Sequence, residues 1–496
     1  MGSTSIEWAL LLGSGVLLLA VIAARITTVV GLPTLLVYLV LGVALGNVHI
    51  GSAHIAAATT HQAEALGIAA VVLILAEGGL TTRVETVRPV LPLALTLSVA
   101  GTAVSVAVVA AAARWLLHFD MRLALLAGAV VAPTDAAAVF SILRRVPIVS
   151  RLGGVLEAES GTNDPLAAML VLAIAAGDWD QRSVVSLVGM LAVQLVVGGV
   201  LGVGIGVAGA AGLRRTALPA SGLYPLSVLA FCVLSYGAAA VVGGSGFLAV
   251  YLTALTLGNA RLPHRAATIG FAEGVGWLAQ IGVFVLLGML VDVSRLGAAV
   301  RPALVLAATL LFLARPLSVA VSAVPFRLPW REQAFLGWAG LRGAVPIVFT
   351  VLAVARGVPG AQRLFDAVFL VVFVLTAVQA PVLAPLARRL GLLDEEAARE
   401  VEVEVAPLER LHADMLQLTI PAGSRMHGVE VEELRLPRKA QLTLVVRGGE
   451  TFAPQPGLRL RVGDSLLIVT PADARRRVEE RLRALSRRGR LANWTD

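Results

Sequence analysis

The sequence has one cysteine and one lysine among its 496 residues, and each scarcity excludes a class of protein. With Cys232 alone, the chain cannot form an intrachain disulfide or a metal site built from cysteines. The lysine, Lys439, follows Pro437 and Arg438, so the chain contains no GxxxxGK[ST] phosphate-binding loop. The chain is therefore neither a disulfide-stabilised scaffold nor an ATP-driven pump of the P-loop kind.

Charged residues are also scarce, at 15% of the chain, whereas 57% are hydrophobic and the mean hydropathy is +0.85. This composition is typical of a multi-spanning membrane protein. A helical span needs about 20 apolar residues. We expect thirteen spans, near residues 8–24, 31–46, 63–80, 90–113, 123–142, 154–176, 184–211, 222–242, 246–259, 268–290, 302–324, 333–355 and 366–386. The predicted fold is an all-α polytopic membrane protein of about 13 transmembrane helices, followed by a small α/β, mainly β, cytoplasmic domain.

The distribution of charge divides the chain near residue 393. Residues 1–393 hold 23 basic and 15 acidic residues, whereas the last 103 residues hold 17 of each. We predict a transmembrane domain over 1–393, an acidic linker over 394–409, a small domain of alternating strands over 410–485 and a basic tail over 486–496.

Arginines in the short loops predict the orientation in the membrane. With the N-terminus outside, the inner loops hold 14 arginines and the outer loops hold 7. We therefore expect a cell-membrane protein, in the plasma or inner membrane, with the N-terminus outside and the C-terminal domain in the cytoplasm. The pI near 10.7 reflects these basic loops, and no nucleic-acid-binding motif is present, so nucleic acid is not an expected partner.

Several ionisable residues fall inside the predicted spans, where a charge is costly unless it is paired or faces water. Each is a functional candidate by default: Glu77, Asp135, Glu157, Glu159, Asp164, Glu273, Arg315 and Arg342. Glu157 and Glu273 lie toward the ends of their spans and are interpreted as solvated or cavity-lining, and Arg315 as a structural charge partner.

The span over 154–176 carries two polar stripes on one helical face. Glu159 and Asn163 are four residues apart, as are Ser160 and Asp164. Their oxygens suit a hard monovalent cation, whereas a transition metal would prefer His or Cys. The alternative is an internal polar network that only holds helices together, a role for which unpaired carboxylates are poorly suited.

Two spans are predicted to be discontinuous. Pro133-Thr134-Asp135 interrupts the span over 123–142, and Gly343-Ala344-Val345-Pro346 interrupts the span over 333–355. Transporters use two such broken helices, one in each repeat, to direct freed backbone groups at an ion site near the bilayer midplane. A charged neighbour at both breaks strengthens this interpretation.

Together these motifs resemble those of the monovalent cation/proton antiporters, within the Asn-Asp class. The matching segments are GLPTLLVYLVLGVALG at 31–46, Glu77 with Gly78-Gly79, Pro133-Thr134-Asp135, Glu159-Ser160 with Asn163-Asp164, and Gly340-Leu341-Arg342-Gly343. AEGGL at 76–80 and SGTNDP at 160–165 are most similar to the potassium/proton branch linked to cell-volume regulation. The resemblance covers essentially the whole chain.

The resemblance implies a role for each matching residue. Asp164 would alternately hold a proton or the cation, and Asn163 and Asp135 would order the site. Glu159 would form a structural ion pair with Arg342. Further oxygens come from three side chains, so that K+ or Na+ would bind at Asp164, Ser160, Thr134 and Glu77. Inverted repeats, a homodimer and the absence of a resident cofactor are also implied.

The expected function is a secondary active antiporter, not an enzyme, because a proton and a cation that compete for one buried carboxylate give coupled exchange. It would exchange cytoplasmic K+ or Na+ for external H+ in pH, cation and volume homeostasis. Asn163 stands where another class of the family carries a second aspartate, which favours electroneutral exchange. A Na+-selective antiporter shares every motif and stays an open alternative, since selectivity depends on fine geometry.

Two other functions are weighed against antiport. An intramembrane aspartyl protease also uses two buried aspartates, but its GxGD motif is absent, since Asp164 follows Gly161-Thr162-Asn163. A ligand-gated cation channel would suit a regulatory tail, but the sequence has no TVGYG-like filter.

The tail is similar to an RCK C-terminal (TrkA-C-like) domain over residues 420–437 and 444–469. Such modules dimerise and bind small cytoplasmic ligands, cyclic dinucleotides among them, so a regulatory role for 410–485 is implied. No GxGxxG motif precedes it, which disfavours regulation by NAD. The alternative is a passive stabilising domain.

Overall fold

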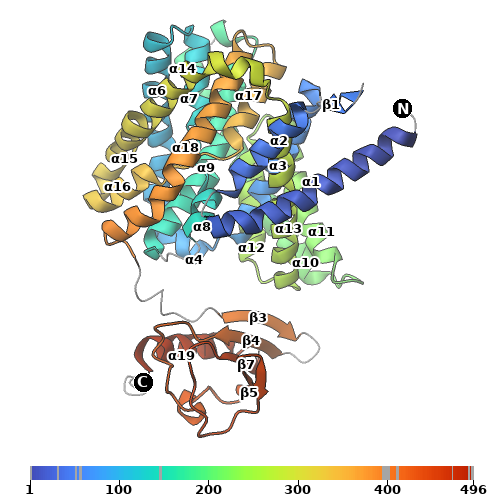
Figure 1. The fold of residues 1–496 in the computed structure, drawn as a ribbon, viewed down its shortest axis with the longest axis vertical. Helices are drawn as coiled ribbons and strands as arrows, with labels where there is room; N and C mark the ends of the chain where they lie inside the picture. Colours follow the sequence, from blue (N-terminus) through green and yellow to red (C-terminus); the bar gives the residue numbers. More distant parts are fainter. Residues whose placement is uncertain are drawn as a thin grey trace. The chain divides into compact units, whose positions relative to one another are not determined.

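The computed structural model describes residues 3–30, 33–47, 49–50, 53–54, 59–143, 148–181, 183–393, 403–408, 413–471, 473–489 and 492. The chain forms two compact units, Met1–Leu392 and Leu393–Asp496. The first unit is almost wholly helical and the second is built on a small β-sheet (Figure 1). The division falls next to the boundary that the charge distribution predicts.

The first unit consists of long apolar helices with short connections. Its uninterrupted helices are α1 (Ser3–Val30), α2 (Thr34–Asn47), α3 (Thr60–Thr81), α9 (Ser150–Ile174), α10 (Val184–Arg215), α11 (Leu223–Val241), α12 (Gly246–Asn259), α13 (Arg265–Met289) and α18 (Ala361–Arg389). Within the described residues, seven continuous helical stretches are long and apolar enough to cross a membrane. The polytopic all-helical fold is confirmed, whereas the count of thirteen spans stays a prediction.

Both predicted breaks are present. The first falls between α7 (Met121–Val131) and α8 (Ala136–Leu143), and the second between α16 (Trp330–Trp338) and α17 (Val345–Ala355). In each case proline lies at or beside the interruption, where it removes a backbone donor and frees a carbonyl. The two discontinuous helices are therefore confirmed.

A helix with a π-helical turn precedes each broken helix. Residues 84–116 contain α4 (Val84–Val87), α5 (Leu91–Thr96), the π-turn η2 (Leu97–Gly101) and α6 (Thr102–Leu116). Residues 293–323 contain α14 (Val293–Thr309), the π-turn η4 (Leu310–Ala314) and α15 (Arg315–Ala323). Each series continues with a broken helix and a long helix, α9 or α18. This recurrence supports the expected repeat, whose inversion stays a prediction.

Close helix packing depends on glycine between α2 and α13. A Cβ added at Gly42 of α2 would lie 2.9 Å from the Cα of Gly288 of α13, which is closer than a Cβ atom approaches a non-bonded atom in real proteins. Small residues allow such approach in apolar surroundings, where packing rather than water exclusion holds helices together. The α2–α13 contact is one wall of the cavity described below.

The second unit contains a five-stranded antiparallel sheet in the order β3-β4-β7-β5-β6. Its elements are β3 (Val403–Leu408), β4 (Ala413–Thr419), β5 (Gln441–Arg447), β6 (Glu450–Phe452), β7 (Ser465–Pro471) and the helix α19 (Arg475–Arg488). Alternate residues of β4 and β7, including Leu416, Leu418, Leu466 and Ile468, point into one apolar core. The mainly β domain is confirmed.

Two predicted boundaries of this unit are wrong in detail. The stretch 403–408 was predicted as linker, but it forms β3 and pairs with β4 from Val403↔Leu418 to Leu408↔Ala413. Its one acidic residue, Glu404, continues the acidic stretch that precedes it, so the charge pattern did not distinguish the strand from the linker. The boundary at 485 is also wrong, because α19 continues to Arg488 and buries Leu485 in the core. Residues 394–402 of the predicted linker lie outside the described residues.

A buried carboxylate anchors the sheet. Asp464 is inaccessible to solvent and accepts hydrogen bonds from Arg447 Nε at 2.7 Å, Arg447 Nη2 at 2.8 Å and the Arg461 backbone N–H at 2.7 Å. Burial alone would raise the pKa of Asp464, but these hydrogen bonds and the two arginine charges outweigh it and hold the pKa below its ordinary value.

The sign of this shift predicts the pH dependence of the second unit. A depressed pKa stabilises the fold above the unfolded-state pKa, about 3.9 for Asp, and this stability is lost as pH falls through the folded-state pKa. Asp464→Asn should lower the unfolding free energy of this unit at pH 7 by about 1.5–3 kcal/mol, since charge-assisted hydrogen bonds are lost. Hydrogen exchange of the β5 and β7 amides in the full-length protein measures this. Equal protection in variant and wild type at pH 7 would contradict it.

Candidate functional site

The two breaks meet in the interior of the first unit. The backbone N–H of Asp135, in the first break, donates to the carbonyl of Leu341, in the second, at 2.8 Å. Gly343 permits this approach, because a Cβ there would collide with the Asp135 carboxylate. Asp135 also caps α8, its Oδ1 accepting from the Ala138 N–H at 3.0 Å. Segments about 200 residues apart in the sequence are thus joined backbone to backbone.

α9 holds the first break through two of its predicted site residues. Asn163 Nδ2 donates to Thr134 Oγ1 at 2.8 Å, and Ser160 Oγ accepts from the Ala136 N–H at 3.3 Å. Asn163 and Thr134 are buried, with 1% and 5% of their surface exposed. The amide of Asn163 therefore fixes the Thr134 hydroxyl, whereas its role in ordering a cation site stays a prediction.

α18 holds the second break in a comparable way. Gln379 Nε2 donates to the Trp338 carbonyl at 2.9 Å, and Trp338 Nε1 donates to the Gln379 carbonyl at 3.1 Å. Thr376 Oγ1 donates to the Arg342 carbonyl at 3.3 Å. The bonds to the Trp338 and Arg342 carbonyls satisfy groups that the interruption of the helix frees, whereas the Trp338 Nε1 bond ends on a carbonyl of α18 itself. Sequence reasoning missed both α18 residues, although they are polar positions in an apolar run.

A cavity of about 460 Å³ opens beside the crossing of the breaks. Five of the predicted binding residues line it: Glu77, Thr134, Asp135, Ser160 and Asp164. Asn163 is not among the lining residues and acts behind Thr134. The structure thus brings together α3, both breaks and α9 around one volume.

The cavity is strongly acidic. Carboxylates of Glu77, Asp135, Glu157, Asp164 and Glu273 line it, and no arginine or lysine of the described residues does. Of these, Asp164 is 8% exposed. A cavity with walls of one charge sign concentrates counter-ions, in this case cations. Glu157 and Glu273, which the sequence predicted to be either solvated or cavity-lining, therefore line the cavity.

Two further polar residues in this cavity were missed by sequence reasoning. Tyr251 of α12 and Gln280 of α13 line it together with Asp164. The Tyr251 ring takes up the space that Gly161 leaves on α9, since a Cβ at Gly161 would overlap the ring. A tyrosine or glutamine in an apolar span carries no local signal that distinguishes a cavity wall from a lipid-facing position.

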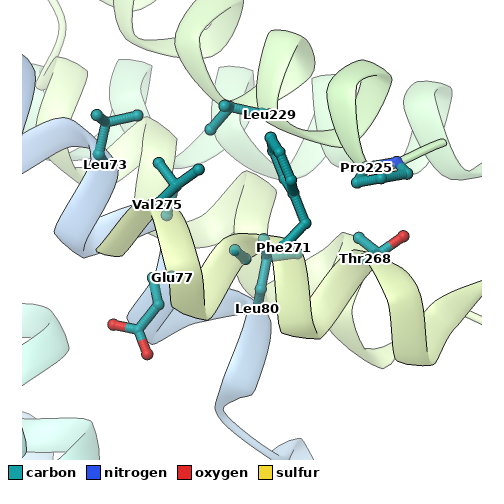
Figure 2. Close-up of a pocket in the computed structure, with 10 residues that line it drawn as sticks. Leu73, Glu77, Leu80, Pro225, Leu229, Thr268, Phe271 and Val275 are labelled. Atoms are coloured by element: carbon teal, nitrogen blue, oxygen red, sulfur yellow. The ribbon is translucent and has the colours of Figure 1, made fainter. Parts of the chain in front are cut away.

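Glu77 lies where the cavity meets an apolar pocket between α3, α11 and α13. Leu80, Phe271 and Leu229 are among the side chains of this pocket, and the Glu77 carboxylate points away from Leu229 and Pro225 (Figure 2). Gly276 of α13 leaves room for the side chain, because a Cβ there would lie 2.8 Å from Glu77 Cγ. The apolar packing therefore directs the carboxylate toward the acidic cavity.

The partner of Glu159 differs from the expectation. Glu159 was expected to pair with Arg342, but its carboxylate receives both terminal nitrogens of Arg315, Nη1 on Oε1 and Nη2 on Oε2, the latter at 2.9 Å. Arg315 Nε also donates to the Leu336 carbonyl at 3.2 Å. Glu159 and Arg315 are 1% and 4% exposed. The geometry explains the difference, because α15 and α9 both pack on the π-turn η2, from where the Arg315 side chain reaches Glu159, whereas Arg342 lies in the second break.

Arg342 is a separate buried cation near the cavity. It is 1% exposed, and its Nε and Nη1 have no hydrogen-bond partner in the part of the chain that the structure describes. It lies within electrostatic range of Asp164, Glu159 and Arg315. Its charge therefore offsets part of the negative charge at Asp164 without contacting the cavity.

Comparison with known proteins assigns both units. Residues 16–389 match the family profile described as "Sodium/hydrogen exchanger, transmembrane", and residues 415–483 match the TrkA-C domain. The K(+)/H(+) antiporter NhaP of Alkalimonas amylolytica is 34% identical over 467 residues, covering 91% of this chain and 79% of that protein. The K(+)/H(+) antiporter NhaP2 of Shewanella baltica (strain OS223) is 33% identical over 476 residues, covering 95% and 82%.

A solved structure shares the fold of the first unit. The sodium proton antiporter MjNhaP1 of Methanocaldococcus jannaschii, solved at pH 8, aligns with a TM-score of 0.67 at 22% identity. The alignment covers 78% of this chain and 99% of that protein.

Proposed function

The chain belongs to the sodium/hydrogen exchanger family, transporters rather than enzymes, and on that premise we propose that it exchanges cytoplasmic K+ or Na+ for external H+. The observation that carries the proposal is the acidic cavity at the crossing of the two breaks, with Asp164 in its wall. Its oxygen donors and the absence of a lining basic side chain among the described residues suit a hard monovalent cation. The protease and channel alternatives find no support in this family membership.

The proposed mechanism is competition for one carboxylate. Asp164 binds either a proton or the cation, and Thr134, Ser160 and Glu77 supply further oxygens to the cation, which is cargo and not a cofactor. Asn163 keeps the Thr134 hydroxyl in place through the 2.8 Å hydrogen bond. Asp135 ties the first break to the second, so that both move as one body. A site that is loaded with either ion carries less net charge across the membrane than an empty one.

Electroneutral exchange is the proposed stoichiometry. Asn163 is neutral, so Asp164 is the single carboxylate of the Asn163-Asp164 pair that changes its ligand. One proton then replaces one monovalent cation, and no net charge moves. This exchange would serve pH, cation and volume homeostasis.

K+ is the proposed cation, because relatives that share most of this chain at 33–34% identity are named K(+)/H(+) antiporters. Na+ is the second candidate, favoured by the solved structure of similar fold, which is named a sodium proton antiporter. We further propose that the N-terminus lies outside the cell and the C-terminal unit in the cytoplasm. The protein would form a homodimer, and the TrkA-C domain would bind a small regulatory ligand such as a cyclic dinucleotide.

Proton movement in inside-out vesicles tests this function. Vesicles from a strain without its own antiporters are acidified and then given potassium or sodium salts. We expect alkalinisation that depends on the cation and persists when the membrane potential is clamped, with a larger response to K+ than to Na+. Alkalinisation that collapses under the clamp would refute electroneutrality. No response to either cation from folded protein would refute antiport of these ions.

A further inference from the structure

The helix α19 has two faces of opposite character. Val478, Leu482 and Leu485 are fully buried and pack on the apolar core of the sheet. Because the second unit's own core occupies this apolar face, the helix cannot insert it into a bilayer. The face that remains available to a partner is the charged one.

The outer face of α19 is strongly basic. The helix carries seven arginines and two glutamates in 14 residues. Six of the arginines are exposed: Arg475, Arg476, Arg477, Arg483, Arg487 and Arg488. The helix keeps a net charge of +5, because its two glutamates cancel only two of the seven arginine charges. Glu479 pairs with Arg475 and Arg483, and Glu480 pairs with Arg476.

This charge is segregated within a unit that is neutral overall. Residues 394–496 hold 17 basic and 17 acidic residues, and α19 alone supplies seven of the basic ones. A neutral domain with its charges mixed would have no preferred partner. A one-sided distribution creates a local positive field that an extended anionic surface can neutralise.

The chain itself keeps α19 near such a surface. Only nine residues, 394–402, separate Leu393 from the first residue of β3. Even fully extended, nine residues span at most about 30 Å. The second unit is thus confined near the membrane that holds the first, so binding of α19 to lipid would be an intramolecular step at high effective concentration.

We propose that the exposed arginine face of α19 binds the anionic phospholipid headgroups of the membrane in which the chain resides. A basic residue near an anionic membrane favours binding by roughly fivefold. The Debye length falls from about 10 Å at 0.1 M salt to about 3 Å at 1 M, so rising ionic strength releases the helix. Contact between the second unit and the membrane therefore depends on both lipid charge and cytoplasmic salt.

Quenching by nitroxide-labelled headgroups tests the proposal in the full-length protein in lipid nanodiscs. A fluorophore is attached at Asp473→Cys, an exposed position two residues before α19, and native Cys232 is buried and does not compete for the label. We expect strong quenching in discs with phosphatidylglycerol, weak quenching in pure phosphatidylcholine, and loss of quenching at 1 M salt.

A matched pair of triple variants separates this face from net charge. Arg476→Gln, Arg477→Gln and Arg483→Gln together should shift the bound-to-free ratio by roughly 100-fold. Arg435→Gln, Arg438→Gln and Lys439→Gln remove the same three charges from exposed positions outside α19 and should change the ratio far less. Glu480→Gln should increase quenching.

Three outcomes would overturn the proposal. Equal quenching in anionic and neutral discs would show that lipid charge is not recognised. Equal effects of the two triple variants would show that α19 is not the binding face. Quenching in anionic discs that stays unchanged at 1 M salt would show that charge does not hold α19 at the membrane.

Discussion

Asp164→Asn should reduce cation-dependent proton movement to the level of vesicles that lack the protein, while the protein stays folded. Asparagine is similar in size to a protonated aspartate, so it fits the cavity, but it can neither bind a proton nor offer a full negative charge to a cation. Both halves of the exchange are lost together. The measurement is alkalinisation of inside-out vesicles after addition of K+ or Na+, with protein amount and thermal unfolding matched to the wild type.

Glu157→Gln is the matched control, because it removes one carboxylate from the wall of the same cavity. We expect this variant to retain exchange with a raised KM for the cation, since it weakens the acidic field but leaves Asp164 in place. If Asp164→Asn retained cation-dependent proton flux, Asp164 would not be the exchanging carboxylate. If both variants lost all flux, the role assigned to Asp164 alone would be wrong.

The ion pair between Glu159 and Arg315 gives the second large expected effect, on stability. Arg315→Gln should destabilise the first unit by about 3–5 kcal/mol, because it leaves the Glu159 carboxylate buried without its partner. The double variant Glu159→Gln with Arg315→Gln should recover much of this loss, since no uncompensated charge remains. Thermal unfolding of the purified protein in detergent measures each step.

Arg342→Gln tests the exchange of partners between the two arginines, since the sequence predicted Arg342 as the partner of Glu159 and the structure has Arg315. Arg342 makes no hydrogen bond through Nε or Nη1 to any described residue, so its loss should cost less stability than the loss of Arg315. In double-mutant cycles, Glu159 should couple strongly to Arg315 and weakly to Arg342. Strong coupling of Glu159 to Arg342 instead would restore the pairing that the sequence predicted.

The sequence reached the cavity residues because a charge within an apolar run is a local signal. Glu77, Asp135 and Asp164 each interrupt a hydrophobic span, where an ionisable group is too costly to be incidental. Thr134 and Ser160 lie beside such charges in the same motifs. The structure lines one cavity with all of them, whereas their role in binding the cation stays a prediction.

Other features gave no local signal. Thr376 and Gln379 donate hydrogen bonds to carbonyls at the second break, which lie 34 and 41 residues away in the sequence. Tyr251 enters the cavity only because α12 packs against α9 at Gly161. The strand β3 could not be told from the acidic stretch before it until its pairing with β4 was known. Such contacts depend on which helices and strands become neighbours.

The sequence by itself determined that this protein is a polytopic membrane protein with two broken helices, a set of buried carboxylates and a small β domain. Composition, hydropathy and proline position act over short stretches, so they can be read without a fold. Only the tertiary structure decided that Glu159 pairs with Arg315, because Arg315 and Arg342 are both more than 150 residues from Glu159 and equally plausible in charge. Pairing over that distance depends on helix packing, which places α15 and α9 on the same π-turn, η2, and leaves Arg342 in the second break.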